Sequence, residues 1–144
     1  MYLVDTNVIS AGAPTKARAS HALAPWMDWN SDRLFMSVIT IAEVEDGIAR
    51  ARRQGARQKA AQLTDWLETV LHLYGDRVLA FDLPAARIAG RLSDLARAGG
   101  HAPDFADLAI AATARAHGLT VLTRNLRHFQ PLGVPVHDPF ASLP

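Results

Sequence analysis

The sequence has no cysteine, which excludes disulfides, zinc–thiolate sites and cysteine nucleophiles. It also has no apolar run near the roughly 18 to 20 residues that a membrane-spanning helix needs. The chain begins Met1-Tyr2-Leu3-Val4-Asp5, without a basic segment ahead of an apolar one, so no signal peptide is expected. These absences fit a reducing compartment, and we expect a cytoplasmic protein with no membrane partner.

Several common catalytic patterns are missing as well. The six histidines form no His-x-x-x-His or His-x-x-His pair, which argues against zinc. There is no Gly-x-Gly-x-x-Gly, no phosphate-loop pattern and no Gly-x-Ser-x-Gly elbow. A phosphatase of the haloacid dehalogenase type would need an aspartate where Asn7 stands, and a lysine late in the chain, where there is none. The sequence therefore argues against that phosphatase.

The bulk composition describes one ordinary globular domain. The 144 residues, 49% hydrophobic and 20% charged, suffice for a single domain over 1–144 with a buried core. The formal net charge of +1 gives no sign of a nucleic-acid binder. Nearly all the positive charge is arginine, whose planar guanidinium suits phosphate. On composition alone, arginines on solvated helix faces are the simpler interpretation.

Apolar runs that end at polar or turn residues predict the strands of a sheet. We expect strands at 2–4, 34–36, 78–81 and 119–122, and a short edge strand at 133–136, since Pro135 cannot serve a central strand. Amphipathic stretches between them predict helices at 19–29, from Thr40 to about Gly55, and at 60–74, 84–98 and 103–117. In the helix at 84–98 the apolar stripe is formed by Ile88, Leu92 and Leu95. The alternation indicates an α/β fold, with a mostly parallel sheet of about four to five strands flanked by helices on both faces.

Acids and amides stand where such a sheet gathers its functional groups, beyond the carboxyl ends of the strands. Asp5 directly follows the first predicted strand, and Thr123 and Asn125 follow the fourth. Glu43 and Asp107 lie early in helices that can point to the same edge. Several carboxylates in one cleft repel each other unless a cation neutralises them. Because hard cations such as Mg²⁺ and Mn²⁺ take oxygen ligands, this pattern points to a divalent metal site.

Each of these residues also has a simpler structural role. Asp5 could satisfy a turn after its strand, and Glu43 could be only the capping-box partner of Thr40. Asp104, which shares a helical face with Asp107, is equally well explained as a cap or first-turn acid. The residues after the fourth strand could form a turn. The functional interpretation is favoured because all of them converge on one edge of the sheet.

Four blocks of the sequence resemble, in order, the signature blocks of the PIN-domain ribonucleases. They are DTNVIS at 5–10, SVITIAEV at 37–44, ADLAIAATA at 106–114 and TRNLRHF at 123–129, and GVPV at 133–136 closes the series. The resemblance spans nearly the whole chain and is strongest to the VapC/FitB-like toxins of bacterial toxin–antitoxin pairs. It implies a PIN-like fold and an endoribonuclease that depends on Mg²⁺ or Mn²⁺.

The resemblance also implies which residues form the site. The family's three main acidic positions fall on Asp5, Glu43 and Asp107, and a fourth acidic position falls on Asn125. The hydroxyl and amide positions that support the acids fall on Thr6, Asn7 and Thr123. Because Asn125 brings an oxygen but no charge, a second metal ion is in doubt. We assign the metal to Asp5, Glu43 and Asp107, with Asp104 either a further ligand or merely a helix-start acid.

The implied partners are an RNA substrate and an antitoxin that inserts a segment into the cleft. A homodimer, or a higher toxin–antitoxin assembly, is expected as well. Arg124 and Arg127 are candidates for holding the RNA backbone, while Arg50, Arg52 and Arg53 could do so or simply face solvent. The sequence gives neither the RNA target nor the cleavage site.

Three residues and one competing function remain open at this stage. His128 follows the proposed site directly, although an ordinary polar role is favoured for it. Trp26 and Trp29, three apart on one helical face, could stack on RNA or meet a partner, and core packing is favoured over both. The competing function is a non-catalytic PIN-like module that binds RNA or protein, which the missing fourth carboxylate allows.

Overall fold

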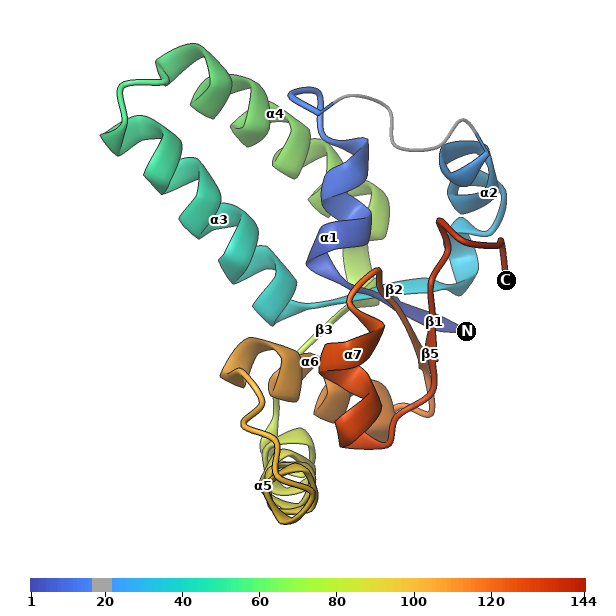
Figure 1. Cartoon of the computed structure of the whole chain (residues 1–144). Helices are drawn as coiled ribbons and strands as arrows, with labels where there is room; N and C mark the ends of the chain where they lie inside the picture. The colour runs from blue at the N-terminus through green and yellow to red at the C-terminus, as the bar shows by residue number, and fades with distance from the viewer. Residues whose placement is uncertain (17–21) are drawn as a thin grey trace.

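Five parallel strands form one sheet in the computed structural model, which describes residues 1–16 and 22–144 (Figure 1). They are β1 (Tyr2–Val4), β2 (Leu34–Ser37), β3 (Val78–Leu79), β4 (Thr120–Leu122) and β5 (Val136–His137). Their order across the sheet is β3-β2-β1-β4-β5, and each neighbouring pair is parallel. The predicted parallel α/β fold is confirmed. The last strand lies at the sheet edge, as expected, but begins after Pro135 instead of at Gly133.

Helices connect the strands and cover both faces of the sheet (Figure 1). The longer ones are α2 (Leu23–Trp29), α3 (Val38–Arg53), α4 (Arg57–Tyr74), α5 (Leu83–Ala98) and α6 (Phe105–Ala116). Two four-residue helices, α1 (Thr6–Ile9) and α7 (Leu126–Phe129), directly follow β1 and β4. One helical turn is too short to give a periodic apolar pattern, so the sequence did not predict them. The predicted helix at 19–29 begins at Leu23, and its residues 19–21 lie outside the described residues.

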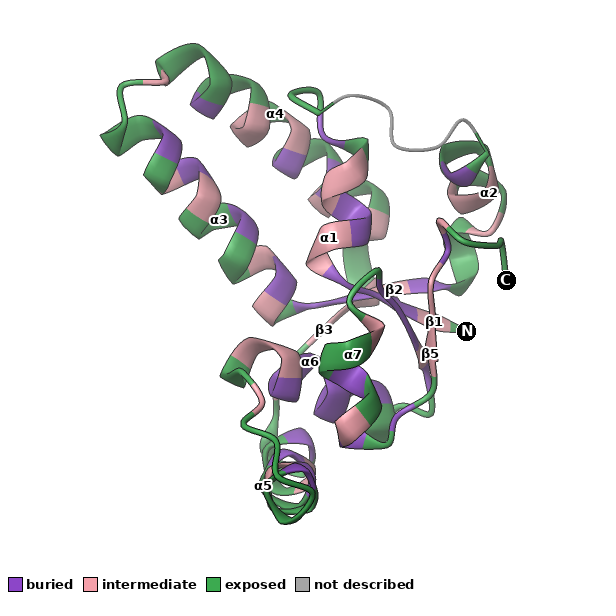
Figure 2. Cartoon of the chain, viewed as in Figure 1, coloured by how far each residue is buried: buried purple, intermediate pink, exposed green. Residues whose placement is uncertain are grey.

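Each face of the sheet has its own core, because successive residues of a strand point to opposite faces. Leu3 of β1 belongs to the cluster that packs α5 and α6 on one face, together with Leu92, Ile110, Val121 and Phe129. Val4, the next residue, belongs to the cluster on the other face, together with Val8, Leu34, Met36, Val70 and Leu122. Figure 2 shows buried residues in the central strands and along one side of the surrounding helices. The sheet is therefore held from both sides, which fixes the positions of its strand ends.

The α3 and α4 helices form a hairpin that extends away from the sheet (Figure 1). The chain reverses at Gly55, whose φ of +77° is a conformation that favours glycine. The hairpin has a small core of its own, formed by Val44, Ile48, Ala51, Ala60 and Leu67. Since α3 begins at the carboxyl end of β2, its first turns lie at the sheet edge and its last turn lies at the tip of the hairpin.

Two local sequence predictions were wrong. The N-cap of α3 lies three residues before the predicted cap, because Ser37 at the end of β2 accepts the Ile39 backbone N–H at 3.1 Å. Thr40 is therefore inside the helix, fully buried, and its hydroxyl has no partner within the described part of the chain. Leu95, expected on the buried stripe of α5, is 53% exposed, and the buried residues of this helix are Ala85, Ala89, Leu92 and Ala96.

The two tryptophans of α2 have different environments. Trp26 is half-buried and meets the Tyr2 ring edge to face, with ring centroids 5.8 Å apart. Trp29 is 89% exposed, so the core packing favoured for the pair is correct for Trp26 and wrong for Trp29. Among residues 1–16 and 22–144, none of the helices is both long and apolar enough to cross a bilayer.

Candidate active site

The strand order places the carboxyl ends of β1 and β4 side by side. From β1 the chain builds β2 and β3 on one side of the sheet, and then β4 and β5 on the other. Val4 at the end of β1 pairs with Leu122 at the end of β4, and the Asp5 backbone N–H donates to the Leu122 carbonyl at 3.0 Å. This is the switch point at which open α/β sheets bind their ligands. Asp5 and Thr123 follow the two paired strand ends, as predicted.

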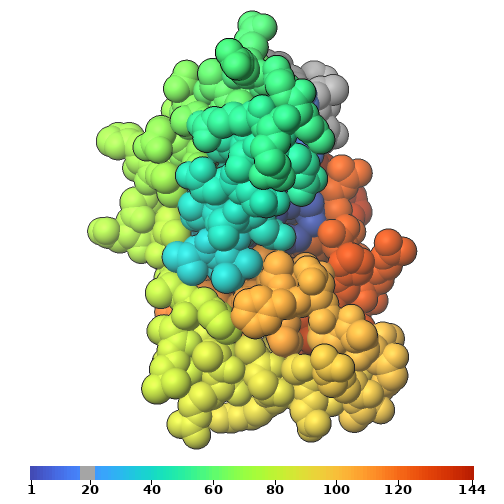
Figure 3. All heavy atoms as spheres, turned by 90° about the vertical axis from the view of Figure 1, so that its left-hand side faces the viewer, coloured from blue at the N-terminus to red at the C-terminus, as the bar shows by residue number. Residues whose placement is uncertain are grey.

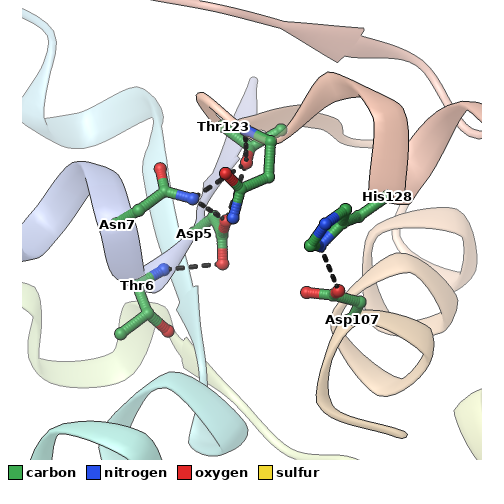
Figure 4. Close-up of polar contacts among 7 residues, drawn as sticks. Asp5, Thr6, Asn7, Asp107, Thr123 and His128 are labelled. Atoms are coloured by element: carbon green, nitrogen blue, oxygen red, sulfur yellow. Dashed lines mark hydrogen bonds and ion pairs between the residues drawn. The ribbon is translucent and has the colours of Figure 1, made fainter. Parts of the chain in front are cut away.

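Asp5 is buried, and its carboxylate accepts three hydrogen bonds. The side chain caps α1 and faces Thr123 (Figure 4). One carboxylate oxygen accepts the Thr6 backbone N–H at 2.7 Å. The other accepts the Thr123 hydroxyl at 2.7 Å and the Asn7 side-chain amide at 2.5 Å. Asp5 therefore combines the turn role that the sequence allowed with a fixed position at the sheet edge.

Asn7 links the ends of β1 and β4 through both the nitrogen and the oxygen of its side-chain amide. Its nitrogen donates to the Thr123 hydroxyl oxygen at 3.1 Å, in addition to Asp5. Its oxygen accepts the Arg124 backbone N–H at 3.1 Å. The Thr123 hydroxyl also accepts the Asn125 backbone N–H at 3.0 Å. Asn7 and Thr123 thus support Asp5, which is the structural role predicted for them.

Glu43 reaches the same edge from α3. The Thr6 hydroxyl donates a hydrogen bond to the Glu43 carboxylate, while the Thr6 backbone N–H donates to Asp5. One residue at the start of α1 therefore joins two of the predicted acids. The capping-box role considered for Glu43 is wrong, because Ser37 caps α3 and Thr40 lies within the helix.

Asp107 comes from the first turn of α6, and its side chain is 17% exposed. Its carboxylate oxygen lies 3.0 Å from Nδ1 of His128 on α7. Figure 4 shows Asp107 and His128 facing each other, both across from Asp5. His128, for which an ordinary polar role was favoured, therefore contacts a candidate catalytic acid, and a role in orienting that acid stays a prediction. The signal in the sequence was its spacing of three from Asn125, which places it on the short helix that leaves the site.

Burial and neighbouring charges raise the pKa values of two acids at the site. Burial raises the pKa of Asp5 from 3.8 to about 6, against the hydrogen bonds from Thr123 and Thr6 that lower it. The charges of Asp107 and Glu43 raise the pKa of Asp5 further. Burial also raises the pKa of Asp107, and the hydrogen bond and charge of His128 oppose that rise. Asp107 and Glu43 are thus close enough to Asp5 for their charges to raise its pKa.

This donor set suits a hard cation, because its side chains offer carboxylate oxygens and its charges repel one another. In the described residues, however, no three aspartate, glutamate or histidine side chains lie close enough together to hold a metal ion. The structure brings Asp5, Glu43 and Asp107 to one edge without closing them into a coordination sphere. Their role as metal ligands stays a prediction.

The other predicted site residues lie around this edge. Asn125 is exposed at the start of α7, and Asp104 is exposed at the start of α6; among the described residues, neither side chain caps its helix. Asp104 raises the pKa of Asp107 through its charge. Arg124 and Arg127 are exposed, and the Arg124 guanidinium lies 4.6 Å from the centre of the Phe140 ring. This contact with the C-terminal segment was not predicted from the sequence.

A model of the PIN domain family matches residues 2–132. The chain belongs to the PIN domain family. Among curated PIN relatives, VapC ribonuclease Y4jK of Sinorhizobium fredii is 39% identical over 142 residues, covering 97% of this chain and 98% of the relative. Toxin FitB of Neisseria gonorrhoeae is 35% identical over 142 residues, covering 97% and 99%.

A solved PIN structure has the same fold along its whole length. The crystal structure of FitAcB from Neisseria gonorrhoeae aligns with a TM-score of 0.86 and 35% identity, covering 99% of this chain and all of that one. The family resemblance drawn from the four sequence blocks is therefore confirmed. The PIN fold accounts for the parallel sheet and for the acids gathered at its switch point.

Proposed function

We propose that this PIN domain is an endoribonuclease that depends on Mg²⁺ or Mn²⁺, and that it acts as the toxin of a toxin–antitoxin pair. The observation that carries the proposal is the convergence of Asp5, Glu43 and Asp107 on one sheet edge, where each has a hydrogen-bond partner. The names of the relatives, VapC ribonuclease and Toxin FitB, support the activity and the role. Cytoplasmic location follows from this proposal, since that is where the RNA lies.

In this proposal Asp5, Glu43 and Asp107 hold the metal ion, and Asp104 is a candidate for a further ligand. When bound, the ion lowers the pKa of a coordinated water and neutralises charge on the phosphodiester oxygens. The carboxylates of this chain supply the oxygen ligands, and burial of Asp5 makes its charge costly without a cation. Because Asn125 adds an oxygen without charge, the affinity for a second metal ion should be low.

The chain's other groups position the acids and the RNA. Thr6, Asn7 and Thr123 fix the carboxylates of Asp5 and Glu43 through the hydrogen bonds described above. Arg124 and Arg127 project from the same edge and bind backbone phosphates, with the Phe140 ring bracing Arg124. Such contacts hold RNA without reading its sequence.

The test is RNA cleavage by the purified chain in Mn²⁺, in Mg²⁺ and in EDTA, with structured and unstructured RNA. We expect cleavage that requires metal and disappears in Asp5→Asn, whereas Asp94→Asn, an exposed acid on α5, cleaves like the wild type. RNA that stays intact in each metal would favour the second candidate, a non-catalytic module that binds RNA or protein. The exposed amide of Asn125 at the fourth acidic position is the observation that favours it.

We further propose an antitoxin partner that inserts a segment into the cleft, and a homodimer or higher assembly of the complex. The relative named as a toxin and the FitAcB structure support the partner. We expect a small reading frame immediately upstream to encode the antitoxin. The test is co-expression of the chain with that reading frame, followed by copurification and mass measurement of the complex. Recovery of the chain alone, as a monomer, would overturn both statements.

A further inference from the structure

A groove of about 470 Å³ lies beside Glu43, between α3 and the start of α6. From α3 it is lined by Ile39, Ala42, Glu43, Asp46 and Arg50, and from α6 by Phe105 and Ala106. Figure 3 shows the first turns of α3 and the start of α6 next to each other on this face. Because Glu43 belongs to the candidate active site, an occupant of this groove would lie next to that site.

Phe105 presents a fixed aromatic ring to the groove. Phe105 is 62% exposed, so much of its ring is open to solvent. The Phe81 ring meets it edge to face, with centroids 5.9 Å apart and planes at 87°, so its orientation is set by packing. Single exposed apolar residues are common and need no function. A braced phenyl ring beside a catalytic acid is a less ordinary arrangement, and it is suited to stacking a flat ligand.

Along the α3 side of the groove, two acidic residues, Glu43 and Asp46, are followed by a basic one, Arg50. Glu43, Asp46 and Arg50 are spaced by three and four residues, so they share one face of the helix. At 1.5 Å per residue, Arg50 lies roughly 10 Å along the axis from Glu43. Arg50 also begins a stretch without acids between Asp46 and Asp65, in which the basic residues are Arg50, Arg52, Arg53, Arg57 and Lys59. All five of these basic residues are exposed.

Arg50 is free to exchange its present partner for a phosphate. Its guanidinium lies 3.3 Å from the Asp46 carboxylate, and the two side chains are 62% and 64% exposed. An exposed ion pair of this kind contributes little to stability, because water screens it. A phosphodiester that entered the groove could therefore take the place of Asp46 at low cost.

We propose that this groove binds one nucleotide of the RNA strand next to the cleavage site, with its base stacked on Phe105 and its phosphate on Arg50. The inference rests on the proposed ribonuclease function. The groove's volume lies within the range of small-ligand sites, about 300–1,000 Å³. Stacking on a single ring accepts any base, since every base has a flat apolar face, so the subsite strengthens binding without fixing the sequence. The cationic stretch beyond Arg50 favours a polyanion over an apolar peptide as the occupant.

The test measures binding of a fluorescent single-stranded RNA by anisotropy in EDTA, and KM and kcat for RNA cleavage in Mn²⁺. We expect Phe105→Ala to weaken binding about ten-fold and to raise KM more than it lowers kcat. Phe105→Tyr, which keeps an aromatic ring, should bind like the wild type. Leu95→Ala is the matched control, because Leu95 is a similarly exposed apolar residue on α5.

The phosphate contact has its own measurement. Arg50→Ala should reduce the slope of log affinity against log salt by about 0.7, the value for one contact to a single strand. Asp46→Asn should strengthen RNA binding, since it removes a negative charge and releases Arg50. Circular dichroism and thermal melts confirm that each variant is folded.

Three results would overturn the subsite. In the first, Phe105→Ala binds and cleaves RNA like Leu95→Ala. In the second, Phe105→Ala changes the mass of the chain in solution, which would make the groove a subunit contact. In the third, Phe105→Ala loses binding to the antitoxin while its RNA binding stays unchanged. Absence of cleavage by the wild type would instead refute the proposed function, and the anisotropy series would then decide the subsite alone. A wild type that neither cleaves nor binds RNA would refute both.

Discussion

Nδ1 of His128 lies 3.0 Å from a carboxylate oxygen of Asp107, and this contact joins α7 to α6 at the candidate active site. It completes a pattern in which each acid has a partner on a different element. Asp5 is held by Thr123 beyond β4, and Glu43 is held by Thr6 of α1. The acids come from three distant parts of the chain, and these contacts set their relative positions once the sheet has formed.

Replacing His128 should lower activity without unfolding the chain. In His128→Ala the Asp107 carboxylate loses the group that orients it, and we expect kcat/KM and Mn²⁺ affinity to fall about 10- to 100-fold, as for other groups that orient metal ligands. The His128 side chain is 42% exposed, so its loss should leave the melting temperature nearly unchanged. His101→Ala, an exposed histidine beyond α5, is the control. Equal activity in both variants would show that Asp107 needs no partner.

Thr123→Val should destabilise the fold more than a similar change elsewhere. Thr123 is fully buried, and its hydroxyl donates to Asp5 and accepts from Asn7 and Asn125. Valine keeps the shape but leaves these groups without their partner, which should cost about 1–3 kcal/mol. Urea denaturation measures this loss.

Thr113→Val is the matched control for that experiment. Thr113 is also fully buried, but its hydroxyl donates only to the Ala109 carbonyl of the same helix, at 2.8 Å, among the hydrogen bonds of the described residues. Because that carbonyl lies within a helix, we expect a loss below about 1 kcal/mol. Equal losses in the two variants would contradict the organising role of Thr123.

The stability of the metal-free protein should depend on pH through Asp5. Its pKa is raised by burial from 3.8 to about 6, so the folded chain holds this proton more tightly than the unfolded chain does. The Asp5 contribution to the free energy of unfolding is therefore greatest below about pH 4. It is lost as the pH rises to about 6, by roughly 3 kcal/mol in total, and is constant above that.

Comparison with Asp5→Asn isolates this contribution, because the other carboxylates titrate in both proteins. As the pH rises from 4 to 6, the free energy of unfolding of the wild type should fall relative to that of Asp5→Asn. Denaturation at several pH values in EDTA measures the difference. A difference that stays constant across this range would contradict a raised pKa for Asp5.

Adding metal should stabilise the wild type and not the variants of its ligands. A ligand at 100 times its Kd stabilises the folded state by about 2.7 kcal/mol. We therefore expect Mn²⁺ to raise the melting temperature of the wild type, and EDTA to reverse the rise. In Glu43→Gln and Asp107→Asn the melting temperature should rise much less. In Asp104→Asn a smaller rise would make Asp104 a ligand, and a rise like that of the wild type would make it only the acid that begins α6. An equal rise in all four proteins would place the metal elsewhere.

Local patterns gave much of the fold in advance. The run at 2–4 ends at Asp5, and it forms β1 with those bounds. The glycines that follow the α3 and α4 helices stand at their ends, with positive φ at Gly55 and Gly75. The failures came where a neighbour in space overrode the local pattern. Thr40 has the spacing of a cap, but β2 extends to Ser37, which takes that role. Leu95 continues an apolar stripe, yet smaller residues of α5 fill the space against α6.

By itself, the sequence determined the alternation of strands and helices, the position of each acid just beyond an apolar segment, and the four blocks that mark the PIN family. These are local properties, because apolar periodicity and turn residues act over a few positions of the chain. The tertiary structure alone decided that Asn7 bridges two strand ends, that His128 holds Asp107, and that Phe105 faces a groove beside Glu43. Those relationships join residues far apart in sequence, and they arise only when packing on both faces of the sheet fixes where its strands end.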